Sequence, residues 1–487
     1  MRKYYFLSFI LVIVSLNSDA QLRNSIWQMG YNGGGAAYQF NFQSGALSIQ
    51  TVSRPMNFGR TNSGISSEQG DLLFYTNGVY VANAMHDTML NGSGLNPGSG
   101  LIPPITGGLR VPQGTLIVPD VGNQNQYYIF HLVTNVYNNL IADALFYTKV
   151  DMSLDGGLGA VTQKNVVLRV DSFDPGELVA TKHANGRDWW VISHQHLTNL
   201  YIKYLVEPTG ISGPYYQNIG VNKYLAGQAV FSEDGLTYAS YDNTNGLEVF
   251  AFDRCTGVFS KYRHINMLDG LVGAGVSFSP NSRYIYVSSN LYIYQFDLLA
   301  ANFSNYDTVA VWDGFFSLTS PYATNFFNQV LGPDGRIYIN SFNSVHHIHV
   351  IAQPDLPGLS CNVQQHSVFL PGYNQTVPNF PNYYLGRQVG SICDTVAPVG
   401  IVESQSLADL EVYPNPASQE FTFDLEWGES VKVSIFDVVG KDVSSQVSVT
   451  PSLSSVLVKN NKLPNGIYYV EVKSAQRTLV GKVILQQ

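Results

Sequence analysis

Two groups of histidines have a spacing that could hold a zinc ion. In each group two imidazoles alternate along a predicted strand, which places them on one face, and a third lies close by in the sequence. The groups are His183, His194 and His196, and His346, His347 and His349. No glutamate follows either group at a general-base spacing, and aromatic residues typical of packed strands surround the first group. We therefore expect structural roles for these histidines and no metal site.

Several aspartates stand beside glycines, a pattern that could indicate calcium ligands. The segments are Asp151 to Gly157, Asp234-Gly235 and Asp334-Gly335. The alternating acidic ligands and distal glutamate of a calcium-binding loop are missing from all three. Aspartate and glycine are also the residues that tight turns require, so we interpret these segments as turns.

The sequence contains no motif for nucleophilic catalysis or for cofactor binding. The glycine-rich segment 30–35 lacks the Lys-Ser/Thr of a phosphate loop, and no Gly-x-Ser-x-Gly elbow occurs. Cys255 follows the basic Arg254, but Asp253 opposes that charge. Paired carboxylates for glycoside hydrolysis stay open, because such pairing is spatial. The sequence thus predicts no catalytic residue and no cofactor.

Aromatic and amide residues gather in predicted loops and give a diffuse binding signal. The segments are Gln124–Tyr128, Pro214–Gln217 and Pro378–Tyr384. Exposed rings with amide groups suit stacking on sugars or contact with another protein. The alternative is that the rings simply reflect the preference of aromatic residues for strands.

The three cysteines allow one disulfide and one remaining thiol. They are Cys255, Cys361 and Cys393. In an oxidising compartment a pair could bridge. We favour Cys361 with Cys393, because these two flank the end of the large predicted domain.

Composition indicates a protein built of strands and turns. The chain has 487 residues, with 45% hydrophobic and only 13% charged residues, against about 25% charged in an ordinary domain. Tyr (31), Phe (26) and Gly (44) are abundant, which favours strands and turns. A net charge of −9, spread thinly, argues against nucleic-acid binding. After residue 20 no segment approaches the ~20 apolar residues of a membrane span.

A loose repeat of a turn followed by two strands runs through most of the chain. Its turn residues recur on average every 53 positions and are Gly70, Gly122, Gly186, Gly235, Ser282 and Gly335. Such a unit cannot bury both faces of its sheet alone, whereas radial stacking buries them and protects the edges. The spacing predicts an all-β, seven-bladed β-propeller over residues 21–395, one unit more than the six visible ones. A two-sheet sandwich array is the competing architecture.

The seventh blade is predicted to be composite. An N-terminal hairpin, Tyr38–Phe42 with Ala46–Ile49, would close the ring by pairing with strands near Val368 and Val389. Such closure joins the first and last blades and removes the open edge.

Both ends of the chain differ from the repeat. Residues 1–20 have the positive start, apolar middle and small-residue end of a secretory signal peptide. Residues 396–408 lack the turn-and-strand pattern and are interpreted as a linker. Residues 409–487 alternate apolar and polar positions in short runs, which predicts a small immunoglobulin-like β-sandwich. Within it, Asn465-Gly466 predicts a tight turn in which Gly466 has positive φ.

The C-terminal unit resembles the type A C-terminal sorting domains of proteins exported by the type IX secretion system of Bacteroidetes. The matching segments are Val412–Pro416, Ile435–Asp437, Leu463–Val470 and Val480–Ile484. Together with Gly440-Lys441, these segments supply the motif residues Pro414, Asn415, Pro416, Gly440, Lys441, Asn465, Gly466, Tyr468 and Lys482. The resemblance implies recognition by the type IX machinery, passage through the periplasm, and a secreted or outer-surface location. In this family the sorting domain is often removed at the surface.

The large domain is similar to propeller regions of such surface proteins. The similar segments are residues 72–92, 150–168, 252–257 and 278–289. This resemblance implies no activity. Two functions stay open: a module that binds a glycan or a protein, which we favour, and a secreted carbohydrate- or polymer-degrading enzyme with its site in the propeller channel.

Overall fold

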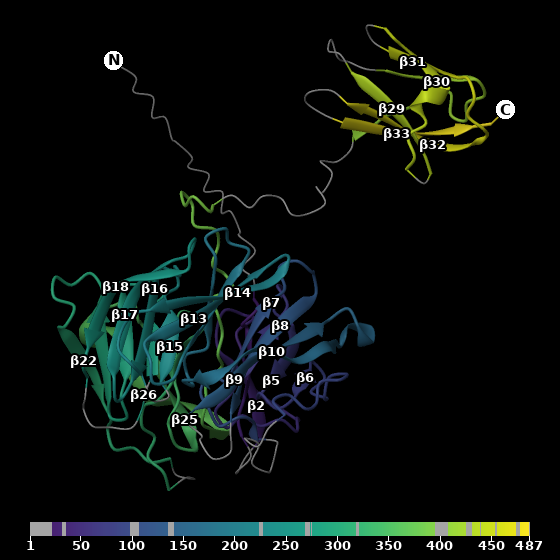
Figure 1. The fold of residues 1–487 in the computed structure, drawn as a ribbon. Coiled ribbons are helices and arrows are strands. Elements are labelled where there is room, and N and C mark those ends of the chain that lie inside the picture. The colour runs from purple at the N-terminus through teal and green to yellow at the C-terminus, as the bar shows by residue number, and fades with distance from the viewer. Residues whose placement is uncertain are drawn as a thin grey trace, which may run out of the picture. The chain divides into compact units, whose positions relative to one another are not determined.

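The computed structural model describes residues 22–31, 36–97, 107–134, 141–223, 227–267, 273, 275–317, 321–394, 408–424, 431–438, 440–452, 455–473 and 478–486. The predicted signal peptide, residues 1–20, and nearly all of the predicted linker lie outside these residues. The chain divides into two compact units, Met1–Val396 and Ala397–Gln487 (Figure 1). Both are built of strands, and among the described residues short 3₁₀ helices occur at Asp155–Gly157, Gly358–Cys361 and Ser444–Gln446. No helix in the described part of the chain is long and apolar enough to cross a membrane.

The first unit is a propeller-like series of antiparallel sheets, each made of three or four consecutive strands. The first two sheets consist of β1 (Ile26–Met29), β2 (Ala37–Asn41) and β3 (Ser48–Val52), and of β4 (Ser63–Ser66), β5 (Leu72–Thr76) and β6 (Val81–Asn83). The next two consist of β7 (Thr115–Pro119), β8 (Gln126–Thr134), β9 (Ala142–Asp151) and β10 (Ala160–Phe173), and of β11 (Val179–Lys182), β12 (Trp189–His194), β13 (Leu200–Glu207) and β14 (Gly210–Asn218). The following two consist of β15 (Gln228–Phe231), β16 (Thr237–Asp242), β17 (Gly246–Asp253) and β18 (Val258–Ile265), and of β19 (Gly275–Phe278), β20 (Tyr284–Ser288), β21 (Tyr292–Asp297) and β22 (Tyr306–Val311). The last consists of β23 (Gln329–Leu331), β24 (Ile337–Ile339), β25 (Val345–Ile351) and β26 (Val363–Asn374).

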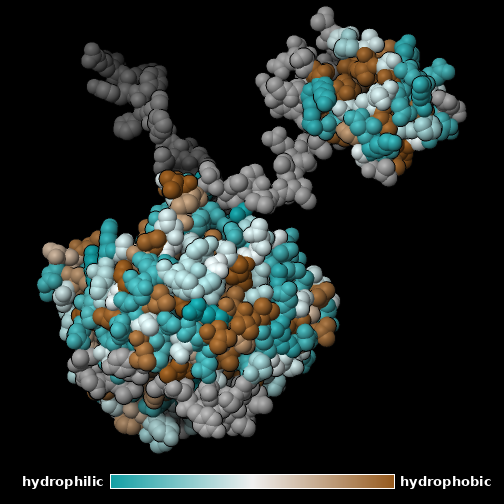
Figure 2. Space-filling model, in the orientation of Figure 1, coloured by the Kyte–Doolittle hydropathy of each residue, from teal (hydrophilic) through white to brown (hydrophobic). Residues whose placement is uncertain are grey.

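Burial changes with the position of a strand in its sheet. Every residue of β12 is buried, whereas most of β18 is exposed. A strand that is buried on both faces has neighbouring sheets on both sides, as radial stacking requires. On the visible face of this unit, apolar residues form small groups among hydrophilic ones (Figure 2).

The first and last sheets of this unit pack against each other. Trp27 and Phe40 share an apolar cluster with Tyr338, Ile348 and Leu370 of the last sheet. In Figure 1 the purple β2 accordingly lies beside the green β25. The two ends of this series of sheets therefore meet through side chains.

The strand pairing expected for the N-terminal hairpin is wrong. Strand β2 pairs with β1 and β3 in a sheet of its own. Val368 pairs with Ile348 inside the last sheet, and Val389 lies in no strand. The sequence pattern had not revealed β1. Because β1 pairs with β2, the free edge of the hairpin finds its hydrogen-bond partner within the N-terminal region.

A later part of the chain, residues 375–384, lies along the inner side of β1. Before it, the backbone N–H of Tyr31 donates to the carbonyl of Tyr373 at 3.0 Å. Further along, the Phe380 ring contacts that of Trp27 at 6.0 Å, and the Tyr384 hydroxyl donates to Asn24 Oδ1. The segment runs antiparallel to β1, but its prolines lack the N–H groups that a strand ladder needs. Strand β1 and residues 375–384 are thus adjacent without forming a ladder.

The second unit is a two-sheet sandwich. One sheet consists of β27 (Ala408–Asp409), β33 (Thr478–Leu485), β32 (Gly466–Lys473) and β29 (Lys432–Asp437), and the other of β28 (Glu420–Asp424), β31 (Ser455–Asn460) and β30 (Val447–Pro451). Alternate residues of these strands point inward, and Phe421, Phe423, Ile435, Val456 and Val470 are buried between the sheets. This unit has a hydrophobic core of its own, as the alternating sequence pattern predicts.

Candidate functional site

Two histidines of the first group contact the same carboxylate. His194 Nδ1 lies 2.9 Å from Asp174 Oδ2, and His196 Nδ1 lies 2.6 Å from Asp174 Oδ1. His183 is elsewhere, with its Nε2 2.9 Å from the carbonyl of Cys255. The three imidazoles therefore do not converge on one point.

The second histidine group is also divided among separate partners. His346 Nδ1 faces the carbonyl of Leu370 at 3.1 Å, and His349 Nε2 faces that of Asn325 at 3.2 Å. His349 is fully buried, and burial lowers its pKa to about 3. It is therefore neutral at pH 7, and its hydrogen bonds explain it as a packed residue.

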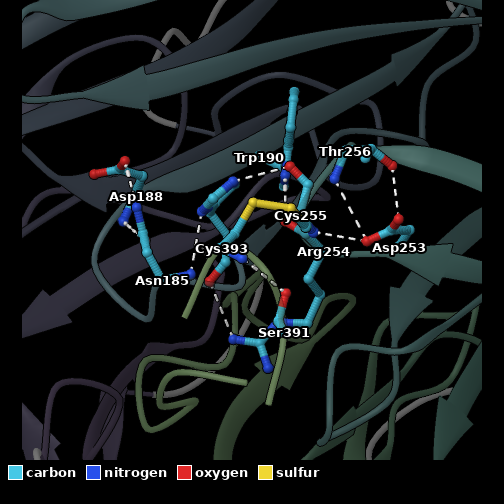
Figure 3. Close-up of a disulfide and its surroundings, with 10 residues drawn as sticks. Asn185, Asp188, Trp190, Asp253, Arg254, Cys255, Thr256, Ser391 and Cys393 are labelled. Atoms are coloured by element: carbon cyan, nitrogen blue, oxygen red, sulfur yellow. Dashed lines mark hydrogen bonds between the residues drawn. A yellow bond between two sulfur atoms is a disulfide. The ribbon is translucent and has the colours of Figure 1, made fainter. Parts of the chain in front are cut away.

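The disulfide differs from the expected one. Cys393 is bonded to Cys255 (Figure 3). Cys361 is a buried thiol. The expectation rested on position in the sequence, whereas the fold brings residue 393 to the β17–β18 turn. The two sulfur atoms lie near His183, but metal binding requires thiolates, and a disulfide offers none.

Hydrogen bonds fix the chain on both sides of this disulfide. The N–H of Cys255 donates to Asp253 Oδ1, and that of Cys393 to Ser391 Oγ (Figure 3). The N–H of Gln388 donates to the carbonyl of Ala184, and Arg254 donates to that of Gly386. Residues 384–394 are therefore attached to turns of two successive sheets.

The aromatic loop segments have different environments. Tyr127 and Tyr128 are buried, and so is Tyr383. Tyr215 and Tyr216 are about half exposed, at 45% and 52%. Strand packing therefore explains most of the first and third segments, and the second remains on the surface.

Amide side chains line the centre of the first unit and bind the edges of the innermost strands. Gln113 both accepts from the backbone N–H of Ala229 and donates to its carbonyl. Gln228 does the same for the backbone of Gln329. Asn379, on the segment that follows β26, donates to the carbonyls of Thr115 and Leu178. These bonds satisfy the strand edges that would otherwise face the channel unpaired.

A cavity of about 330 Å³ remains at this centre. Its walls come from the innermost strands of several sheets and from residues 376–384. Aliphatic and aromatic residues form much of the wall, including Val179, Phe231, Phe278, Val330 and Phe380. A volume of this size lies at the lower end of the range for small-molecule sites.

Glu233 is the ionisable acid of this cavity. It lies in the turn after β15 and lines the cavity, and its Oε2 accepts from Asn382 Nδ2 at 2.9 Å. Burial, with a smaller effect from neighbouring Asp234, raises its pKa to about 7. Among the described residues Glu233 forms no ion pair. Sequence reasoning missed this residue because the adjacent Asp234-Gly235 indicated only a turn.

The raised pKa of Glu233 predicts a pH-dependent stability. The folded state retains a proton that the unfolded state loses near the usual pKa of 4.5. The stabilising contribution is therefore complete below about pH 4.5 and is lost as the pH rises through about 7. The charged or ionisable groups around it are Asp234, Tyr384 and Arg254, which donates to the carbonyl of Asp234. Urea unfolding at pH 5, 6, 7 and 8 should show wild type losing stability relative to Glu233→Gln, and a constant difference would contradict this.

A second candidate site is an aromatic patch formed by the loop after β22 and by strands β25 and β26. The aromatic patch consists of Trp312, Phe315, Phe316, His347, His366 and Phe369. Phe315 stacks on His366 with ring centres 3.9 Å apart, and Phe369 contacts His347 at 5.3 Å. Phe316 and Phe369 are 52% and 64% exposed. Sequence reasoning missed the patch because its residues come from separate segments.

Hydrogen bonds hold the aromatic patch in one arrangement. Gln365 donates to the carbonyl of Val311 at 2.8 Å and accepts from the N–H of Asp313 at 3.2 Å. The Asp313 carboxylate lies 3.0 Å from His366 Nε2. The loop after β22 is therefore attached to β26, and its rings are presented on a fixed surface.

A buried ion network links the β11–β14 sheet to the β15–β18 sheet. Lys223 Nζ lies 3.0 Å from Glu177 Oε1 and 3.1 Å from Glu248 Oε2. The Tyr201 hydroxyl accepts a further bond from Lys223 at 3.2 Å. All four side chains are almost fully buried, so we interpret the network as structural.

The predicted motif residues of the second unit lie mainly at strand junctions. Asn415 Nδ2 donates to the carbonyl of Lys482, and Asn415 Oδ1 accepts from the N–H of Ile484. Pro414 and Pro416 flank this clamp on β33. The N–H of Lys441 donates to Asp437 Oδ1, and neighbouring Gly440 has φ of 83°.

The remaining motif residues belong to the entry of β32. The Tyr468 hydroxyl donates to the carbonyl of Pro464, just before Asn465. Gly466 is the first residue of β32 and does not have positive φ. The turn conformation expected for Gly466 is therefore wrong, because this residue already pairs with Leu485 in the sheet. A Cβ at this position would meet nothing closer than 3.6 Å.

Comparison with known proteins matches the second unit to a family. Residues 411–486 match the family model described as a secretion system C-terminal sorting domain. None of the curated proteins matches the chain.

Solved structures similar to this chain cover its larger part. A protein from Lactobacillus plantarum is 12% identical, with a TM-score of 0.46, over 72% of this chain and 97% of that chain. A putative 6-phosphogluconolactonase from Bacteroides fragilis is 14% identical, with a TM-score of 0.45, over 72% of this chain and 95% of that chain.

Proposed function

Because the chain is a cargo of the type IX secretion system and reaches the cell surface or the extracellular space, we propose that its first unit is a glycan-binding module. The sorting domain directs export, and the propeller-like unit acts outside the cell. The observation that carries the proposal is the aromatic patch, in which Phe316 and Phe369 are more than half exposed on a rigidly held surface.

The chemistry of the aromatic patch suits a sugar. Exposed ring faces offer apolar contact to the C–H face of a sugar ring, and the nearby Asp313, Gln365 and His366 can bond its hydroxyls. The Phe315–His366 stack and the Gln365 bonds limit the motion of these groups before a ligand arrives. Little ordering is then required on binding, which favours affinity.

The enzyme alternative placed its site in the channel of the propeller. Residues 376–384 line that channel, and the cavity beside them is about 330 Å³. A polymer chain would have to displace this segment, whose Asn379 and Asn382 bond several sheets. This arrangement disfavours a polymer-degrading site in the channel. We therefore favour a binding function for the first unit.

We further propose that the sheets of the first unit are the blades of a closed seven-bladed propeller. In this proposal β1, β2 and β3 form the outer part of a composite blade, and residues 375–384 supply its innermost segment. The contacts of Phe380 with Trp27 and of Tyr384 with Asn24 support it. We also propose that residues 21–395 and 409–487 are separate domains joined by the linker 396–408.

Substitution of the exposed rings tests the binding proposal. A glycan array probed with the 21–395 fragment should identify a ligand, and titration should then show at least about 10-fold weaker binding for Phe316→Ala and Phe369→Ala. This corresponds to ~1.4 kcal/mol, a typical loss for an aromatic residue central to an interface.

Tyr216→Ala is the matched control, because Tyr216 is equally exposed but lies on β14. It should bind like wild type. A loss confined to Tyr216→Ala would place the site elsewhere, and capture of a protein but of no glycan would contradict the ligand class.

A further inference from the structure

We propose that the central cavity of the first unit binds a small hydroxylated primary amine, whose ammonium group meets the Glu233 carboxylate and whose hydroxyl meets Gln329 Oε1. This site is separate from the aromatic patch and does not depend on glycan binding. It rests on the shape of the cavity, on the hydrogen-bond state of its polar groups and on its charge.

The hydrogen bonds that the polar groups of the cavity already form show which ligand groups the cavity can bind. The amide N–H groups of Gln113, Gln228 and Asn379 donate to backbone carbonyls, and Gln113 also donates to Asn379 itself. Asn382 donates to the backbone carbonyl and the side chain of Glu233. These donors are therefore engaged, and they contribute little to binding a ligand that brings only acceptors.

Two acceptors of the cavity are incompletely used. Gln329 is 2% exposed, its Nε2 donates to Ser288 Oγ, and its buried Oε1 has no hydrogen-bond partner among the described residues. Glu233 accepts through Oε2 from Asn382 and has no ion pair in the described part of the chain. A buried acceptor without a donor is costly, so a ligand that donates to both is favoured.

Charge decides between neutral and cationic ligands. A carboxylate in a half-buried site without a cation is poorly stabilised, and its pKa, raised by burial to about 7, reflects this. An ammonium group supplies both the missing charge and the missing donors. Arg60 also lines the cavity, and its charge disfavours a second ammonium group, so we assign a hydroxyl to the other end.

The apolar walls of the cavity determine the chemistry of the middle part of the ligand. Phe231 is the last residue of β15, two positions before Glu233, and Val330 follows Gln329 on β23. Both line the cavity together with Phe380. Such apolar walls suit a short carbon chain or a sugar ring between the two polar ends.

Calorimetric titration of the full chain at pH 8 tests the proposal with three probes of matched size. The probes are 6-amino-1-hexanol, neutral 1,6-hexanediol and anionic 6-hydroxyhexanoate. We expect the amine to bind at least 10-fold more tightly than the diol and the anion not to bind. Equal affinity for amine and diol, or no binding of any probe, would overturn the proposal.

Variants at the two acceptors identify the site. Glu233→Gln retains an acceptor for Asn382 but removes the charge, and it should weaken amine binding at least 10-fold while leaving the diol unchanged. Gln329→Met should weaken both probes. Amine affinity of wild type should rise between pH 6 and pH 8, whereas that of Glu233→Gln should stay constant, and unaltered amine binding by both variants would contradict the assignment.

Phe316→Ala separates this site from the aromatic patch. It should bind the amine like wild type even where it loses glycan binding. Loss of amine binding in Phe316→Ala would show that the probe occupies the surface and not the cavity.

Discussion

Replacement of Cys393 by serine is expected to lower the free energy of unfolding of the first unit by about 5 kcal/mol. The disulfide joins residues 138 positions apart, and a cross-link over a loop of that length removes much of the conformational freedom of the unfolded chain. The bond also fixes residues 384–394 to the turn at Cys255, next to the bonds that Arg254 and Gln388 form. Its loss therefore frees a segment that ends beside the central cavity.

Urea unfolding of the oxidised full chain, followed by tryptophan fluorescence, measures this effect. Wild type in a reducing agent should approach Cys393→Ser, and Cys393→Ser itself should not respond to the reductant. Cys361→Ala is the control, because Cys361 is a buried thiol outside the disulfide. It should keep the full response to reduction. Two reactive thiols in oxidised, unfolded Cys361→Ala would mean that the bond is absent.

The disulfide shows what sequence position alone does not reveal. Cys361 and Cys393 flank the end of the large predicted domain, and this suggested their pairing. The fold instead places Cys361 in the buried core between two sheets, among residues such as Tyr286 and Ile351. Cys393 follows a segment that crosses the centre of the unit. Only three-dimensional packing decides between these partners.

The strand architecture was easier to predict than its closure. Asp234-Gly235 and Asp334-Gly335 are turns between strands, with both glycines at positive φ, as the local chemistry requires. Closure depends instead on residues 375–384, which contain Pro378 and Pro381. Because proline is disfavoured inside strands, the sequence of this segment does not have a strand pattern, although the segment lies along β1.

The candidate sites were beyond sequence reasoning for a different reason. Glu233 and Gln329 are nearly 100 residues apart, and each looks ordinary in its own strand or turn. The aromatic patch combines Phe316, in the loop after β22, with Phe369 on β26. Local patterns predict strands and turns, whereas sites of this kind arise from side chains that the fold brings together.

Substitution of a single glycine in the sorting domain is expected to have the second large effect on stability. A Cβ at Gly481 would lie 2.5 Å from the carbonyl oxygen of Leu410 and 2.8 Å from Val412 Cγ2. The nearest atom belongs to the backbone of the segment that runs parallel to β33 and pairs with it, so it cannot move aside like a flexible side chain. We expect Gly481→Val to destabilise this domain by about 3 kcal/mol, the upper range for overpacking.

Localisation in the native host is the measurement. Full-length Gly481→Val should accumulate in the periplasm with a folded first unit, because the sorting domain is no longer presented intact to the secretion machinery. Gly466→Ala is the matched control: Gly466 begins β32 without positive φ, and its added Cβ would meet only the ring of Tyr468 at ordinary contact distance. It should be exported normally. Normal surface display of Gly481→Val would show that the packing of Leu410 on β33 is dispensable for sorting. Retention of both variants in the periplasm would mean that export depends on the sequence at these positions and not on the fold of the domain.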